Sequence, residues 1–238
     1  MTAPHLVAVS PHLDDAAFSA GWTLANYVRD GGRVTVATCF TGNIDRPEGF
    51  ALACQLDKGL GPEVDYMALR RAEDERACAV IGAEPVHLSF LEAPHRGYAS
   101  AAALFGPRLA GDDAADRLAP ELARLVEGAT LVIGPLGLGG HVDHLHVREA
   151  LERVVDPERF FYWEDWPYLD RVPESRGNPD WTVDLDDELI GKRIAMCAAY
   201  ESQLGFQFGG RAAMEDRLRA IEQERFHAPP APDLPRIR

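Results

Sequence analysis

The chain has 238 residues, and 46% of them are apolar, which is enough to fill the core of one sizeable domain. Its 24 basic and 38 acidic residues give a formal net charge of −14. Because binding to phosphate groups requires clustered cations, this charge argues against nucleic acid and anionic membranes as partners.

The first part of the chain reads as strand, helix, strand. Residues 5–10 form a short apolar run that predicts a strand, and apolar residues at helical spacing predict a helix over 15–29. Gly31 and Gly32 end that helix, and the β-branched segment 33–39 predicts a second strand. A crossover of this kind is right-handed and makes the two strands parallel.

The same alternation continues along the rest of the chain. Further strands are predicted over 85–89, 130–134, 160–163 and 181–183, and further helices over 67–81, 114–127, 142–155, 187–202 and 214–224. Segments without periodicity are predicted as long loops over 41–65, 91–111 and 164–180. The alternation predicts the α/β class with a doubly wound, mostly parallel sheet. We expect one domain over 1–227 and a Pro-rich C-terminal tail over 228–238.

Cysteine usage and hydropathy bear on the compartment. The four cysteines form no Cys-x-x-Cys pair, which is typical of buried free thiols in a reducing environment. No apolar run approaches the roughly 18 residues of a membrane span, and no leader pattern precedes a cleavage site. We therefore expect a soluble, cytoplasmic protein.

A first cluster of polar residues follows the first predicted strand and contains His12, Asp14 and Asp15. In a doubly wound sheet, ligands bind beyond the carboxyl ends of the strands. Adjacent carboxylates diverge, so one aspartate can bind a metal ion while the other acts on a water as general base. His12 is a natural second ligand as a neutral imidazole. The alternative is that an aspartate here only caps the helix that follows.

A second cluster, His141-Val-Asp-His144, follows the strand over 130–134 and a glycine-rich turn. The turn lacks the lysine of a phosphate loop and the glycine spacing of a dinucleotide fingerprint. His141 and His144 share one face of a helix start, so either can complete a two-His-one-carboxylate metal site while the other stabilises an oxyanion. We expect Asp143 to orient a histidine and His146 to be a surface residue.

At these residues the sequence resembles the PIG-L/LmbE-like deacetylase family, whose motifs are His-Pro-Asp-Asp-Glu after the first strand and His-x-Asp-His later. The likeness covers most of the chain, although Leu13 and Ala16 depart from the first motif at positions that bind no metal. The resemblance implies a Rossmann-like, three-layer αβα sandwich and zinc-dependent hydrolysis of an N-acyl group, usually the N-acetyl group of an amino sugar.

Carried over residue by residue, the resemblance implies a division of roles. His12, Asp15 and His144 match the ligands of a Zn²⁺ ion, with Fe²⁺ or another divalent ion as alternatives. Asp14 matches the general base, and His141 matches the residue that stabilises the tetrahedral intermediate.

Three further residues are weaker candidates for substrate contact. Arg70 falls where family members contact substrate, although the run 70–76 also reads as a charged helix face with internal pairs. Glu164 and Asp165 follow the strand over 160–163 and either reach substrate hydroxyls or form a solvated turn.

The sequence therefore predicts a metal-dependent N-deacetylase whose partner is a small N-acylated substrate, such as an acetylated amino sugar or a glycosylated metabolite. Its oligomeric state is not predicted. The alternatives are an amidase for a non-sugar N-acyl compound and a catalytically silent sugar-binding paralogue. A ferrous oxygenase also uses two histidines and one carboxylate, but such enzymes are usually built on double-stranded β-helices, whereas this chain alternates strands and helices.

Overall fold

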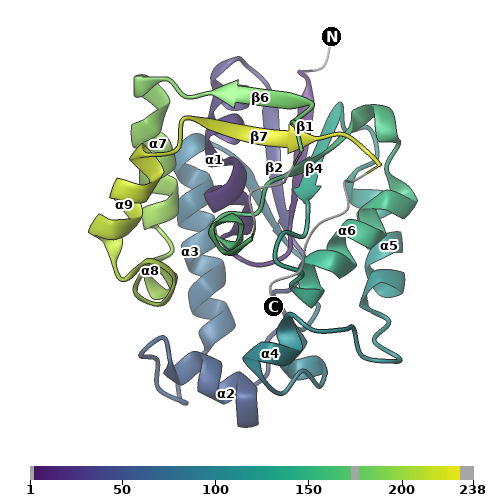
Figure 1. Cartoon of the computed structure of the whole chain (residues 1–238), viewed down its shortest axis with the longest axis vertical. Helices are drawn as coiled ribbons and strands as arrows, with labels where there is room; N and C mark the ends of the chain where they lie inside the picture. Colours follow the sequence, from purple (N-terminus) through teal and green to yellow (C-terminus); the bar gives the residue numbers. More distant parts are fainter. Residues whose placement is uncertain (1–2, 173–176, 231–238) are drawn as a thin grey trace.

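The computed structural model describes residues 3–172 and 177–230. A sheet in the order β3-β2-β1-β4-β5-β7-β6 forms the middle layer of the molecule (Figure 1). Its strands are β1 (His5–Ser10), β2 (Arg33–Thr38), β3 (Glu84–His87), β4 (Leu131–Pro135), β5 (Phe160–Trp163), β6 (Trp181–Asp184) and β7 (Gln223–His227). The first five strands pair in parallel, and β7 runs antiparallel to both of its neighbours.

Helices cover both faces of this sheet. One face carries α1 (Asp15–Arg29), α3 (Tyr66–Ile81) and α7 (Asp187–Ala198), and the other carries α5 (Ala114–Leu125) and α6 (Val142–Val154) (Figure 1). Beside the first group lie α8 (Glu201–Phe208) and α9 (Arg211–Arg219). The short helices α2 (Gly49–Leu56) and α4 (Ala101–Leu104) lie at the lower end of the view. The predicted three-layer αβα sandwich is confirmed.

The central strand β1 is buried on both faces. Leu6 and Ala8 pack into the core beneath α1 and α3, whereas Val7 and Val9 pack into the core beneath α5 and α6. A strand covered on both sides has no solvent-facing residues, which is why its sequence is continuously apolar and does not alternate.

The order of the strands reverses between β1 and β4. From β1 the chain proceeds through β2 to β3 on one side, and it returns to place β4 and β5 on the other. Because β1 and β4 pair in parallel, with Leu6 opposite Leu131, their carboxyl ends lie side by side. The connections that leave these two strands diverge, and ligands bind in the crevice that results.

The C-terminal part differs from the sequence prediction. The helix predicted over 214–224 ends at Arg219, and residues 223–227 form the strand β7. Helix-forming residues such as Gln223 and Glu224 are recruited into the sheet by pairing with β6, an example of tertiary contacts overriding local propensity. Of the predicted Pro-rich tail, residues 231–238 lie outside the described residues.

The predicted charged face of α3 is also corrected. Glu73 and Asp74 are buried rather than solvated. Glu73 accepts hydrogen bonds from the backbone and hydroxyl of Ser202, at 2.8 and 2.7 Å, and Asp74 accepts one from the Tyr200 hydroxyl at 2.7 Å. The polar residues of this face therefore bind the N-terminal end of α8 and the residue that precedes it, which the sequence pattern does not reveal.

None of the helices in the described ranges combines the length and the apolar character that crossing a bilayer requires.

Glu224 offers a test of how β7 is held. Its buried carboxylate accepts hydrogen bonds from the backbone N–H groups of Trp22 and Thr23, at 2.9 and 2.8 Å, and lies 3.4 Å from Arg193 Nε. Glu224→Ala leaves these donors unpaired in the core and should lower the free energy of unfolding by about 3–5 kcal/mol in urea titrations. The exposed neighbour Glu222 is the control, and Glu222→Ala should change little. Equal effects of the two substitutions would contradict this account.

Candidate metal and catalytic site

The connection after β1 places the side chains of His12, Asp14 and Asp15 at the crevice. The Ser10 hydroxyl donates to the carbonyl of His12 at 2.7 Å and accepts from the N–H of Ala16 at 3.1 Å, which ties the turn together. Asp14 adopts φ 158° and ψ −29°, a conformation that residues with a side chain rarely adopt. Asp14 precedes the first residue of α1, but its side chain makes no capping hydrogen bond. The capping alternative is therefore wrong for this side chain, and the carboxylate is available to the crevice.

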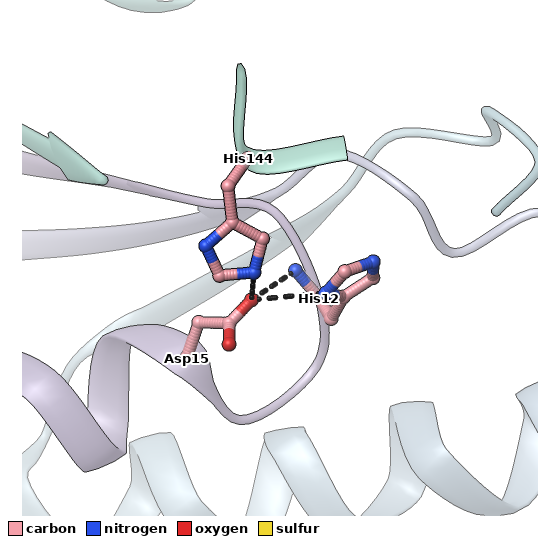
Figure 2. Close-up of side chains that lie close together, drawn as sticks. All are labelled: His12, Asp15 and His144. Carbon is pink, nitrogen blue, oxygen red and sulfur yellow. Dashed lines mark hydrogen bonds and ion pairs between the residues drawn. The ribbon is translucent and has the colours of Figure 1, made fainter. Parts of the chain in front are cut away.

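His12, Asp15 and His144 meet where the two connections converge (Figure 2). Asp15 Oδ2 lies 3.1 Å from His12 Nδ1 and 3.2 Å from His144 Nε2. Two ligand atoms held about 2.1 Å from a tetrahedral ion lie roughly 3.4 Å apart, so this spacing suits a metal ion. His144 Nε2 is buried and has no hydrogen-bond partner among the described residues. The three residues therefore fit a divalent cation.

A second set of potential ligands, His12, His141 and Asp143, also lies close together. The Asp143 carboxylate is already engaged, because one oxygen accepts from the N–H of Ala93 at 3.0 Å and the other lies 2.8 Å from Arg96 Nη1. The first set is the better ion site for this reason.

Buried carboxylates orient both histidines of the first set. Asp143 Oδ2 lies 3.0 Å from His12 Nε2, and Asp165 Oδ1 lies 2.7 Å from His144 Nδ1. The other oxygen of Asp165 accepts hydrogen bonds from the backbone N–H groups of residues 137–138. A carboxylate behind each imidazole leaves the opposite nitrogen directed at the ion site. The orienting role expected of Asp143 agrees with this geometry. Asp165, predicted to contact substrate, has both of its oxygens bonded within the protein, behind His144.

Asp14 lies beside this site in a buried position. Its Oδ2 accepts a hydrogen bond from Gln207 Nε2 at 2.9 Å, and its Oδ1 lies 3.4 Å from Arg70 Nη2. Burial raises the pKa of Asp14 to about 7; neighbouring Asp15 adds to the rise, and Arg70 opposes it. Arg70, predicted to contact substrate, lines the cavity. Its guanidinium also donates to Glu92 at 2.7 Å and lies beside Asp14, so it helps to hold the Asp14 carboxylate in place. No sequence signal marks Gln207, which reaches the site from α8.

His141 is placed as a neutral hydrogen-bond donor. Its Nδ1 accepts the N–H of Asp143 at 3.3 Å, an arrangement that assigns the ring proton to Nε2. Burial, assisted by the positive charge of His12, lowers the pKa of His141 to about 3. The Phe105 ring packs edge-on against the imidazole, with 5.3 Å between centroids. A fixed, neutral N–H donor of this kind can stabilise negative charge that develops on a carbonyl oxygen.

The polar residues open into a cavity of about 300 Å³. Segments outside the sheet supply its walls. Among them are Phe50 from α2, Lys58 just after α2, Phe105 just after α4, and Phe206 from α8. Tyr168 also lines the cavity and packs edge-on against His144, with 5.0 Å between ring centroids. An apolar wall beside a few convergent polar groups is the usual form of a small-molecule site.

Two other predicted residues lie elsewhere. Glu164, predicted to contact substrate, is not among the residues that line this cavity; its carboxylate lies 3.1 Å from His227 Nε2 and 3.4 Å from Arg225 Nε. His146, predicted at the surface, is 1% exposed, and its Nε2 lies 3.0 Å from Asp112. The partners of Glu164 and of His146 both lie on other segments of the chain.

Fold and site together define a doubly wound α/β protein in which a His₂Asp cluster that could hold a metal ion lies beside a buried carboxylate. A family model described as PIG-L, GlcNAc-PI de-N-acetylase, matches residues 7–155. The chain belongs to the PIG-L family.

Individual relatives agree with this assignment. The chain is 35% identical to 2'-N-acetylparomamine deacetylase of Streptomyces fradiae over 210 residues, which cover 82% of this chain and 72% of the relative. It is 27% identical to a 1D-myo-inositol 2-acetamido-2-deoxy-alpha-D-glucopyranoside deacetylase of Corynebacterium glutamicum, with 86% of this chain and 76% of the relative covered. A crystal structure of the zinc-inhibited form of teicoplanin deacetylase superposes with a TM-score of 0.79 at 25% identity, covering 94% and 97% of the two chains. The predicted family and the hydrolytic N-deacetylase class are thus confirmed.

The contact between the Asp165 carboxylate and His144 can be tested by substitution. Asp165→Asn keeps the shape of the side chain but removes the charge that orients the imidazole, and such changes typically weaken metal binding about 10- to 100-fold. Competition with a chromophoric chelator would measure the affinity for Zn²⁺. Asp170→Asn, a change at an exposed residue nearby, is the control and should bind Zn²⁺ like the unsubstituted chain. Wild-type affinity in Asp165→Asn would show that this carboxylate does not support the ligand.

Proposed function

We propose that the protein is a zinc-dependent N-deacetylase that removes the acetyl group from an amino sugar or from a glycosylated small metabolite. One observation carries the proposal: a His₂Asp cluster lies beside a buried carboxylate and a neutral imidazole donor, and both of these groups line a single cavity. In this reading His12, Asp15 and His144 hold the ion, and the donor set is one that zinc commonly accepts.

The residues around the ion divide the hydrolysis between them. When bound, the ion polarises the acyl carbonyl and makes water more acidic. Asp14 takes a proton from the attacking water and delivers a proton to the nitrogen of the leaving amine, so that an amide and water become an acid and an amine. His141 Nε2–H donates to the carbonyl oxygen as negative charge develops there. Arg70 and Gln207 keep the Asp14 carboxylate directed at the cavity.

The choice of an amino-sugar substrate is supported by the relatives and by the cavity. The relatives named above are deacetylases of 2'-N-acetylparomamine and of an acetamido-deoxyglucopyranoside of inositol. A cavity of about 300 Å³ with aromatic walls, including Phe105 and Tyr168, suits the faces of a sugar ring.

We further propose that residues 1–227 fold as one domain and that the protein acts in the cytoplasm. Strand β7 ends at His227 and lies between β5 and β6, so the sheet requires the chain up to that residue. Cys39, Cys78 and Cys197 are buried free thiols, as is common in reducing compartments.

A substrate panel tests the proposed function. Purified protein should release free amine from N-acetylated amino sugars or their glycosides when one equivalent of Zn²⁺ is present, and a chelator should stop the reaction. Fe²⁺ is tested in parallel on the same chelated sample, with metal content measured at each step. Metal-loaded protein that binds acetylated sugars and releases no amine would identify a binding protein instead.

Asp14→Asn separates ion binding from catalysis. Asparagine has the same shape and tolerates unusual backbone conformations, but it cannot accept the proton of water. We expect the variant to bind Zn²⁺ with unchanged stoichiometry and to lose about two to four orders of magnitude in kcat. Turnover near that of the unsubstituted chain would exclude Asp14 as the base.

A further inference from the structure

A chain of buried polar contacts continues behind the His12 imidazole, away from the cavity. Asp143, which lies against His12 Nε2, is 0% exposed, and its second oxygen lies 2.8 Å from Arg96 Nη1. Arg96 follows β3 in a short 3-10 helix (Ala93–Arg96). Its guanidinium contacts the Asp143 carboxylate, and its side chain is only 12% exposed.

Arg96 is itself clamped from the other side by Asp112. Its Nε and Nη2 donate to the two oxygens of Asp112, at 3.1 and 3.0 Å, in a two-pronged arrangement. The Tyr98 hydroxyl donates to Asp112 at 2.9 Å, and His146 Nε2 lies 3.0 Å from the same carboxylate. A forked guanidinium held in this way has little freedom to rotate, so the nitrogen that faces Asp143 is fixed.

We propose that Arg96 and Asp112 are positioning residues of the ion site, which act on the ligand His12 through Asp143. The inference rests on the proposed metal site and goes beyond it, because neither residue lies against the ion, the water or the substrate. Arg96 lies against the fully buried Asp143 carboxylate, and Asp112 fixes the direction from which it does so.

The physical reason lies in the cost of a buried charge. A buried carboxylate is stable in one position only when its oxygens keep their partners. Without Arg96, Asp143 would lose the guanidinium that holds its Oδ1 at 2.8 Å, and its other oxygen would be held less firmly against His12 Nε2. The His12 ring would then be less well oriented, so Nδ1 of His12 becomes a weaker ligand. A purely structural role for Arg96, holding two loops together, would change the stability of the fold and leave ion affinity intact.

The test measures Zn²⁺ affinity by chelator competition on folded, full-length protein. We expect Arg96→Gln to weaken binding about 10-fold and Arg96→Lys, which keeps the charge but not the fork, to weaken it less. Arg117→Gln is the matched control, because Arg117 is 62% exposed on α5 and its ion-pair partner is Asp113. The control should bind Zn²⁺ as the unsubstituted chain does.

A double-mutant cycle identifies the route. If Arg96 acts through Asp143, then Arg96→Gln combined with Asp143→Asn should bind Zn²⁺ no more weakly than Asp143→Asn alone. Fully additive losses, or unchanged affinity in Arg96→Gln with only a lower melting temperature, would overturn the proposal.

Two further outcomes keep the test decisive. Should Arg96→Gln not fold, Asp112→Asn serves in its place: weaker Zn²⁺ binding supports the proposal, and unchanged binding overturns it. An unsubstituted chain that binds no divalent ion would refute the ion site, and this inference with it. A chain that binds the ion normally in every variant refutes the positioning role alone.

Discussion

The parallel pairing of β1 with β4 is the constraint on which the rest of the site depends. The two strands are more than 120 residues apart in sequence, and their register brings the connections that follow them to the same edge of the sheet. His12 and Asp15 come from the first connection, and His144 comes from the second. Both strands are buried, so the connections that carry these side chains start from the core of the sheet.

Burial makes this arrangement electrostatically demanding. Among the residues that the structure describes, the guanidinium groups of Arg70 and Arg96 lie against the carboxylates of Asp14 and Asp143. Burial acts to lower the pKa of His144, but Asp15 and Asp165 outweigh it and raise that pKa to about 9. A divalent cation binds the neutral imidazoles and compensates the same excess of negative charge. The ion and the protons therefore compete for the same imidazole nitrogen atoms. The fold therefore builds a site whose negative charge favours occupation by a cation.

Recognition and chemistry come from different parts of the fold. The groups assigned to chemistry lie at the carboxyl ends of β1 and β4, whereas much of the cavity wall comes from α2, α4 and α8. Short helices on connecting segments can change in sequence without disturbing a sheet. This division agrees with the similarity of the chain to proteins with names as different as 2'-N-acetylparomamine deacetylase and teicoplanin deacetylase.

The sequence by itself determined the α/β class, the two His/Asp clusters and their position after strands, because periodicity and motif spacing are written in short, contiguous segments. Tertiary structure alone decided which side chains meet. Asp143 and His12 are 131 residues apart, and Asp14 meets Gln207 across 193 residues. No local sequence pattern indicates the strand β7, the position of Asp165 behind His144 or the contact between Arg96 and Asp112. The partners of a buried charge depend on proximity in the fold and not on spacing along the chain.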